Sequence, residues 1–251
     1  VQVFNGFGKT MGLVQLEEMG SIEAPILLTN TLSAGVVYDA VVRIMLEQNE
    51  DIGNTTGTVN PIVCECNDGE INQIRGLFVT EDHARQALAN CGQEFAEGAV
   101  GAGRGMLCHQ CKGGFGSASR VIELDGREYT VGALVLTNHG KLRDLTVEGR
   151  PVGEAYLASI EDREDKGSCI MLLATAIPLS ERQLRRMCRR AVIGLHRLGS
   201  YMGNGSGELC IGFTTANRLP HYSQRDVLPL GMLHDDKMNL VFRAAAEAFP
   251  E

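Results

Sequence analysis

The pair Gly167-Ser168 has the residue types of a self-activating nucleophile. It stands between the charged residues 161–166 and the largely apolar residues 169–177. If the bond between the pair were cut, Ser168 would carry a free α-amine beside its own Oγ. Such an amine has a pKa of about 7.7–8.0 and can serve as the general base that a weak hydroxyl nucleophile needs. Gly167 lacks a Cβ, which lowers the cost of bringing Oγ near the carbonyl. The alternative is a plain turn before a strand.

A second group follows in the sequence Gly205-Ser206-Gly207-Glu208. A carboxylate near an ammonium group holds that group and tunes its pKa, so Glu208 could position a new α-amine. The alternative is a glycine turn that leaves Glu208 solvated before a strand. Asn138 ends an apolar segment, and its side-chain NH₂ could stabilise an oxyanion. The alternative for Asn138 is an Asx turn before Gly140.

Two further patterns are weaker. Cys108 and Cys111 form a CxxC pair. A zinc site would need two more ligands, and Cys64-x-Cys66 is a poor second half, so we expect no metal; a redox dithiol remains open. The glycine-rich residues 98–116 do not satisfy GxGxxG, so we expect backbone packed near the active site and not a nucleotide site.

Secondary-structure signals alternate along the chain. The Asp125-Gly126 pair between two β-rich runs predicts a hairpin, and Ser180 with Gln183 predicts a capping box opening a helix that ends at Gly199. A basic face on this helix is expected to be solvated or paired with acids, with a subunit interface as the alternative; its residues are Arg182, Arg185, Arg186, Arg189 and Arg190. Residues 149–166 are expected to form an exposed loop suited to cleavage. Further strands are expected at residues 24–28, 61–64, 168–177 and 209–213, and helices at 35–47 and 80–91. This mixture predicts two sheets layered with helices.

Composition limits the class of protein. The chain has 251 residues, 44% hydrophobic and 22% charged, with a net charge of −8. The acidic balance argues against a nucleic-acid partner, and no apolar run approaches the roughly 20 residues of a membrane span. Several of the eight cysteines lie in apolar runs, which favours free thiols and a cytoplasmic location. No internal linker is evident, so we expect one domain, 1–251.

Several segments resemble the autoprocessing aminopeptidases of the DmpA type, which include L-aminopeptidase/D-amino-acid esterases and β-peptidyl aminopeptidases. Their order and spacing match over nearly all of the chain. The segments are residues 5–8 with Gly12 and residues 17–20; residues 28–31 with Ser33 and Gly35; residues 101–106, 108–109, 112–116 and 118–120; and residues 199–200 and 204–208.

The resemblance implies an α/β (α+β) fold, a four-layer αββα sandwich like that of DmpA and ornithine acetyltransferase. It implies cleavage between Gly167 and Ser168 into fragments 1–167 and 168–251, with Ser168 as nucleophile. Ser206 and Glu208 would hydrogen-bond around the nucleophile and its amine, and Asn138 would stabilise the oxyanion.

The resemblance also assigns a substrate site. Glu65 would hold the amino group of the substrate. Asn67 stands where some members have a tyrosine that assists the oxyanion, a departure that bears on substrate range. No metal or cofactor is implied, and the partners are a small peptide, amide or ester substrate and further copies of the processed αβ unit.

The expected function is therefore a serine aminopeptidase that releases N-terminal residues, including β- or D-amino acids, from short peptides, amides or esters. One alternative is an ornithine-acetyltransferase-like acyltransferase, although those enzymes usually present threonine where this chain has Ser168. The other is a non-enzymatic thiol or redox binding module built on the CxxC pair.

Overall fold

The computed structural model describes residues 1–157, 161 and 163–251. Its central element is a five-stranded sheet in the order β1-β11-β10-β7-β6. These strands are β1 (Gln2–Gly6), β6 (Gly114–Leu124), β7 (Arg127–Asn138), β10 (Ser168–Thr175) and β11 (Gly207–Thr214). β10 and β11 are parallel, and the other neighbours are antiparallel. The predicted hairpin joins β6 to β7, with positive φ at both Asp125 and Gly126, as a type I′ turn requires.

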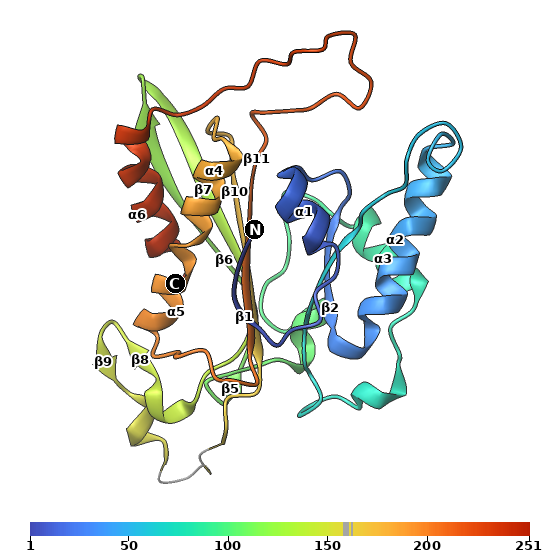
Figure 1. The fold of residues 1–251 in the computed structure, drawn as a ribbon. Helices are drawn as coiled ribbons and strands as arrows, with labels where there is room; N and C mark the ends of the chain where they lie inside the picture. The colour runs from blue at the N-terminus through green and yellow to red at the C-terminus, as the bar shows by residue number, and fades with distance from the viewer. Residues whose placement is uncertain (158–160, 162) are drawn as a thin grey trace.

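Helices cover one face of this sheet (Figure 1). They are α4 (Glu181–Cys188), α5 (Ala191–Arg197) and α6 (Met238–Ala248). The core between them and the sheet includes Cys169, Met171 and Leu173 of β10, which alternate along the strand toward the helices.

The long helix predicted after Ser180 is instead two short helices. The capping box of Ser180 and Gln183 is present at the start of α4, but the helix stops at Cys188 and a new one starts at Ala191. Gly199, at φ +93°, then ends α5. No glycine or proline lies at residues 189–190, where the helix breaks. The apolar spacing continues through these residues, so the sequence pattern predicts one continuous helix.

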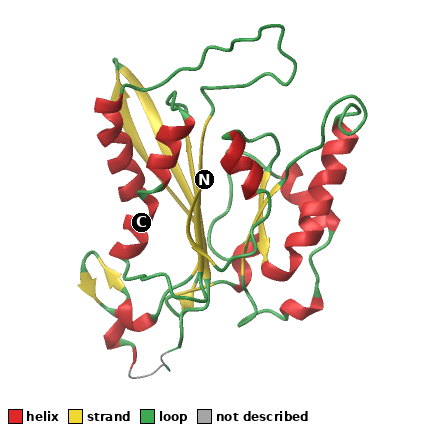
Figure 2. Cartoon of the chain, in the orientation of Figure 1, coloured by secondary structure: helices red, strands yellow, loops and turns green. Residues whose placement is uncertain are grey.

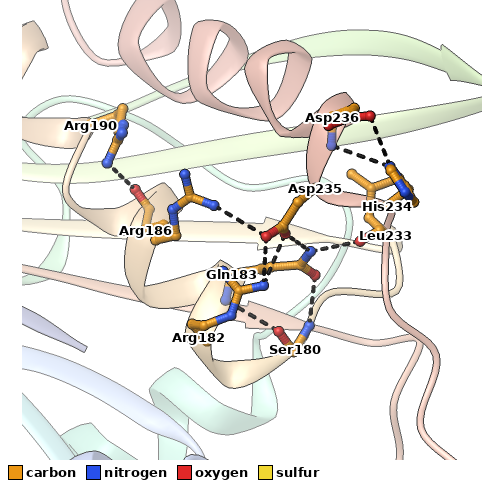
Figure 3. A network of polar contacts seen from close by, with 9 residues as sticks. All are labelled: Ser180, Arg182, Gln183, Arg186, Arg190, Leu233, His234, Asp235 and Asp236. Atoms are coloured by element: carbon orange, nitrogen blue, oxygen red, sulfur yellow. Dashed lines mark hydrogen bonds and ion pairs between the residues drawn. The ribbon is translucent and has the colours of Figure 1, made fainter.

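A polar network ties the start of α4 to the segment before α6 (Figure 3). The Asp235 carboxylate accepts hydrogen bonds from Arg182 at 2.9 Å and Gln183 at 2.7 Å, and Arg186 lies 3.7 Å away. This part of the arginine-rich face is therefore paired with an acid. Arg190 lies over the ring of Phe242, 3.9 Å from its centroid.

The other face of the large sheet carries a second, smaller sheet. β2 (Ile26–Asn30) and β3 (Ile62–Cys66) pair in parallel. Apolar side chains of β3, among them Ile62 and Cys64, pack against Ile170 and Leu209 of the large sheet. The far face of the small sheet is covered by α2 (Ala34–Gln48) and α3 (Glu81–Ala89).

The layers are therefore helix, sheet, sheet, helix, and the predicted αββα sandwich is confirmed (Figure 2). The remaining elements are α1 (Leu13–Met19), a short hairpin of β4 (Leu107–Cys108) and β5 (Cys111–Lys112), and a second one of β8 (Thr146–Val147) and β9 (Arg150–Pro151). No described helix is both long and apolar enough to cross a membrane.

The segment predicted as an exposed loop, residues 149–166, is more structured than expected where it is described. β9 and a 3-10 turn at Gly153–Ala155 lie within it, and Gly153 is buried against the carbonyl of Leu142. Residues 158–160 and 162 of this segment lie outside the described part.

Candidate active site

Ser168 is the first residue of β10, in the middle of the large sheet. Its register partners are Asn138, the last residue of β7, and Gly207, the first residue of β11. Three strand ends therefore meet at Ser168, which is only 6% exposed. Its α-nitrogen is joined to Gly167 in a continuous chain, so the structure describes the uncleaved form.

The Gly207 N–H lies against both Ser168 Oγ and the carbonyl oxygen of Gly167. It is 3.1 Å from the carbonyl oxygen of Gly167 and 3.3 Å from Ser168 Oγ. A donor on the carbonyl oxygen polarises the carbonyl and stabilises negative charge that forms there. Ser168 Oγ and the Gly167 carbonyl oxygen thus both lie next to the same N–H group.

Gly167 is required for a reason that the sequence does not reveal. A Cβ at this position would lie 1.6 Å from the carbonyl oxygen of Asn138. No side chain fits there without separating β10 from β7. The glycine thus allows β7 and β10 to remain paired up to Ser168.

Asn138 lies on the same side of the sheet as Ser168. Its Oδ1 accepts a hydrogen bond from the N–H of Leu107 at 2.8 Å, and its Nδ2 donates to the carbonyl oxygen of Asn67 at 2.8 Å. Asn67 meets Asn138 through its backbone, because its own Oδ1 accepts from Gly69 N at 2.9 Å in an Asx turn. The structure therefore brings these two predicted residues together and fixes the orientation of the Asn138 amide.

Ser206 and Glu208 form a buried pair, both 0% exposed, in which Ser206 Oγ donates to Glu208 Oε1. Burial, with a smaller contribution from the charge of Asp165, raises the pKa of the Glu208 carboxyl from 4.5 to about 7, although hydrogen bonds from Ser206 and Asn5 act to lower it. Oε2 of Glu208 has no hydrogen-bond partner in the structure.

The pair does not meet Ser168 Oγ in this form of the chain. Leu209 of β11 points toward the small sheet and Cys210 toward the helices, so alternation turns Glu208 to the helix side. Ser168, two residues before Ile170, points to the small-sheet side. The uncleaved chain therefore does not bring Ser206 and Glu208 to Ser168 Oγ, and Glu208 lies beside Cys169. The expected contact of the pair with the nucleophile and its free amine stays a prediction for the cleaved chain.

Glu65 is buried on the small-sheet side, with 2% exposure. Its Oε1 accepts from the Lys9 N–H at 2.6 Å, and its Oε2 accepts from Thr31 Oγ1. Gly8 lies between Glu65 and Gly207, and Gly207 in turn contacts Ser168. Both carboxylate oxygens thus already have protein partners.

Asp165 is a site residue that sequence reasoning missed. Its carboxylate is 7% exposed and accepts from Gly140 N at 3.0 Å and Gly203 N at 3.2 Å. These glycines follow β7 and precede β11. Asp165 thereby fixes the chain three residues before Ser168. The charged residues 161–166 before the predicted cleavage site are the sequence signal, but no pattern distinguishes Asp165 from its neighbours.

A pocket of about 340 Å³ lies beside Gly167 and Asn138. Asn67, Leu107, Asn138 and His139 line one part of it, and residues 163–167 line another. The segment before Ser168 therefore occupies part of the space beside the candidate oxyanion donor. Glu65 does not line this pocket.

The glycine-rich residues 98–116 pack as backbone beside this site, as predicted. A Cβ on Gly113 would lie 2.5 Å from the carbonyl oxygen of Thr137. Lys112 holds the loop, because its Nζ donates to the carbonyl oxygens of Gly103, Met106 and Gly113 at 2.8, 3.0 and 2.6 Å. Leu107, which precedes Lys112 in this loop, donates its N–H to Asn138 Oδ1.

Comparison with known proteins defines the class. The structure superposes on an L-aminopeptidase D-Ala-esterase/amidase from Ochrobactrum anthropi, described as a variant of the Ntn hydrolase fold, with a TM-score of 0.90 and 37% identity over 99% of this chain and 69% of that one. A Burkholderia sp. β-aminopeptidase gives a TM-score of 0.90 with 38% identity, over 99% of this chain and 70% of that one. The fold is that of the Ntn-hydrolase variant.

The family follows from the sequence match. Residues 1–251 match peptidase family S58, and the chain belongs to that family. It is 38% identical to the β-peptidyl aminopeptidase BapA of Sphingosinicella microcystinivorans over 98% of its length. The chain spans 65% of the length of that relative.

Proposed function

We propose that this chain is an autoprocessing serine aminopeptidase that acts on short peptides, amides or esters. The observation that carries the proposal is the shared Gly207 N–H, which lies 3.1 Å from the Gly167 carbonyl oxygen and 3.3 Å from Ser168 Oγ. Membership in a peptidase family favours this function over the acyltransferase and the thiol-module alternatives.

Processing begins with an acyl shift within the chain. Ser168 Oγ attacks the carbonyl carbon of Gly167, the new C–O bond replaces the C–N bond, and the hydroxyl proton passes to the departing α-amine. Water then hydrolyses the ester and leaves a carboxylate on Gly167. The Gly207 N–H stabilises the charge that forms on the carbonyl oxygen.

In the processed protein, the α-amine of Ser168 takes the proton of its own Oγ, which attacks the carbonyl of the substrate's first residue. Asn138 is placed to donate its amide N–H to the oxyanion. The protonated amine supplies the proton to the leaving group, and water hydrolyses the acyl-enzyme.

Glu208 acts on the α-amine and not on Oγ. Its carboxyl lies on the helix side of the strand, with Oε2 free of partners. Cleavage releases the nitrogen of Ser168 from the peptide, so it can turn toward this carboxyl. The new ammonium would then stabilise the charged form of Glu208.

The substrate takes the place of Lys166 and Gly167, the two residues before Ser168, in the pocket. These residues become a chain end on cleavage and no longer need to line it. Glu65 and Asn67 are the proposed substrate contacts. Because Glu65 holds Lys9 N and Thr31, its use as an amine ligand requires one of these hydrogen bonds to open.

Two broader features complete the proposal. The processed αβ unit forms homo-oligomers, as the family resemblance implies. The protein works in a reducing compartment such as the cytoplasm, since all eight of its cysteines are free thiols.

The test is hydrolysis of aminoacyl amides, aminoacyl esters and short β-peptides by the wild type and by Ser168→Ala. We expect activity in the wild type and its loss, by at least about 10³-fold, in the variant. Ser168→Thr retains a hydroxyl nucleophile and serves as the matched variant. Activity that survives in Ser168→Ala would reject the proposal.

A further inference from the structure

The sequence alone offers the CxxC pair of Cys108 and Cys111 too few partners for a metal site. The structure supplies different partners. Among the described residues, Cys108, His109 and His139 form a group in which one ligand atom from each lies within 4.8 Å of the others. Cys111, the other cysteine of the motif, is exposed and is not in this group.

The backbone brings the group together in an unusual way. His109 and Gln110 form the turn of the β4-β5 hairpin, with φ of +47° and +61°. Non-glycine residues in this left-handed region cost energy and persist only where the surroundings hold them. The His109 N–H donates to the carbonyl oxygen of His139 at 2.7 Å, which fixes the hairpin to the residue after Asn138.

His109 has the hydrogen bonding of a metal ligand. Its Nδ1 lies 2.9 Å from the carbonyl oxygen of Lys141, and because a carbonyl only accepts, Nδ1 carries the hydrogen. Nε2 therefore has a lone pair, and it is buried with no hydrogen-bond partner. A backbone acceptor on one ring nitrogen commonly orients a histidine whose other nitrogen binds metal.

His139 is likewise incompletely satisfied. It is 3% exposed, and its Nδ1 has no hydrogen-bond partner. Its Nε2 lies 3.9 Å from Cys108 Sγ, whereas tetrahedral zinc with bonds of about 2.3 Å to sulfur and 2.0–2.1 Å to nitrogen places such atoms roughly 3.6 Å apart. Small side-chain shifts would bring the three atoms to bonding distance. The thiol of Cys108 thus has His139 Nε2 beside it, and the buried Nε2 of His109, which has no partner, belongs to the same group.

The charge around the group is suitable for a cation. Asp165, a buried carboxylate, is close enough to act electrostatically on both Cys108 and His139. A thiolate and this carboxylate together would balance a divalent ion. His139 also lines the pocket, from which a water could supply a fourth ligand.

We propose that Cys108, His109 and His139 bind one transition-metal ion of borderline softness, with zinc as the natural choice. Binding converts the Cys108 thiol to a metal thiolate and releases its proton to solvent. The ion fixes the residue after Asn138 to the hairpin and so stabilises the loops beside the candidate active site.

The experiment is titration of the metal-stripped full-length protein with Co²⁺ and Zn²⁺. We expect one ion per chain, a thiolate-to-Co²⁺ charge-transfer band, displacement of that band by Zn²⁺, and a rise in the thermal midpoint. These readouts do not require peptidase activity. Absence of the band, or binding well below one ion per chain, would overturn the proposal.

Variants identify the ligands. Cys108→Ser should abolish the charge-transfer band, whereas Cys111→Ser, in the same hairpin, should retain it. His109→Asn, which tolerates the left-handed backbone, should weaken binding by at least about tenfold and keeps the test open if Cys108→Ser does not fold. A band that persists in Cys108→Ser, or disappears only in Cys111→Ser, would contradict the assignment.

Discussion

At the scale of single residues, the site depends on two glycines and one carboxyl. Gly167 and Gly207 allow three strand ends to meet around Ser168. The Glu208 carboxyl lies on the other face of the sheet, and its Oε2 has no hydrogen-bond partner. The sequence indicated all three positions. It could not indicate the face on which Glu208 lies, because that depends on the register and direction of β11.

Gly167→Ala should disrupt the site sterically. The added Cβ would lie 1.6 Å from the Asn138 carbonyl oxygen, so β7 and β10 must separate. We expect a loss of about 3 kcal/mol of stability and slow or absent processing, measured by chemical denaturation and by mass. Gly57→Ala is the control, since a Cβ there meets nothing within 4 Å. Equal behaviour of the two variants would contradict the packing argument.

Glu208 should make the uncleaved chain less stable as the pH rises. Its folded pKa of about 7 exceeds the ordinary value of 4.5, so the folded state holds the proton more tightly than the unfolded state. Its contribution is full below about pH 4.5 and is lost as the pH rises to about 7. The loss is of the order of 3 kcal/mol.

This effect is measured by urea denaturation across pH in the Ser168→Ala background, which keeps the chain uncut. Comparison is made with the same protein carrying Glu208→Gln. We expect the difference in stability between the two proteins to change over this window. A difference that is independent of pH would mean that Glu208 is not buried as described.

At the scale of elements, the sequence predicts most of the layers of the sandwich, but it does not predict where the helix after Ser180 breaks. The β6-β7 hairpin and the capping of α4 were local signals and are confirmed. The break between α4 and α5 and the helix α6 were not predicted, because packing on the sheet decides them. Cys108 and His139 are 31 residues apart, so their meeting depends on the pairing of β4-β5 against β7.

Lys112→Met should loosen the glycine-rich loop. The ammonium group of Lys112 donates to three loop carbonyls, and methionine keeps the length of the side chain without any donor. We expect a loss of about 1–2 kcal/mol of stability and slower processing, because Leu107 of this loop orients Asn138. Lys237→Met, in the turn before α6, is the control. Unchanged processing in Lys112→Met would show that the loop does not position Asn138.

At the scale of the whole molecule, the two predicted fragments share one sheet. β10 and β11 come from the part after Gly167, and they lie between β1 on one side and β7 on the other, both from the part before it. The apolar cores on both faces of the sheet also contain side chains from both fragments. The fragments 1–167 and 168–251 should therefore behave as one folding unit even after the chain is cut.

Size-exclusion chromatography of processed protein tests this. We expect both fragments to elute together in native buffer and to separate only in denaturant, since separation would expose both cores to water. Elution of two independent species in native buffer would contradict a shared sheet.

The intact mass of the purified wild-type protein under denaturing conditions tests the central claim most directly. We predict two species whose masses correspond to cleavage between Gly167 and Ser168, and a single uncut species for Ser168→Ala. A wild-type protein that remains one uncut chain of 27.1 kDa would contradict the claim that Ser168 becomes an N-terminal nucleophile.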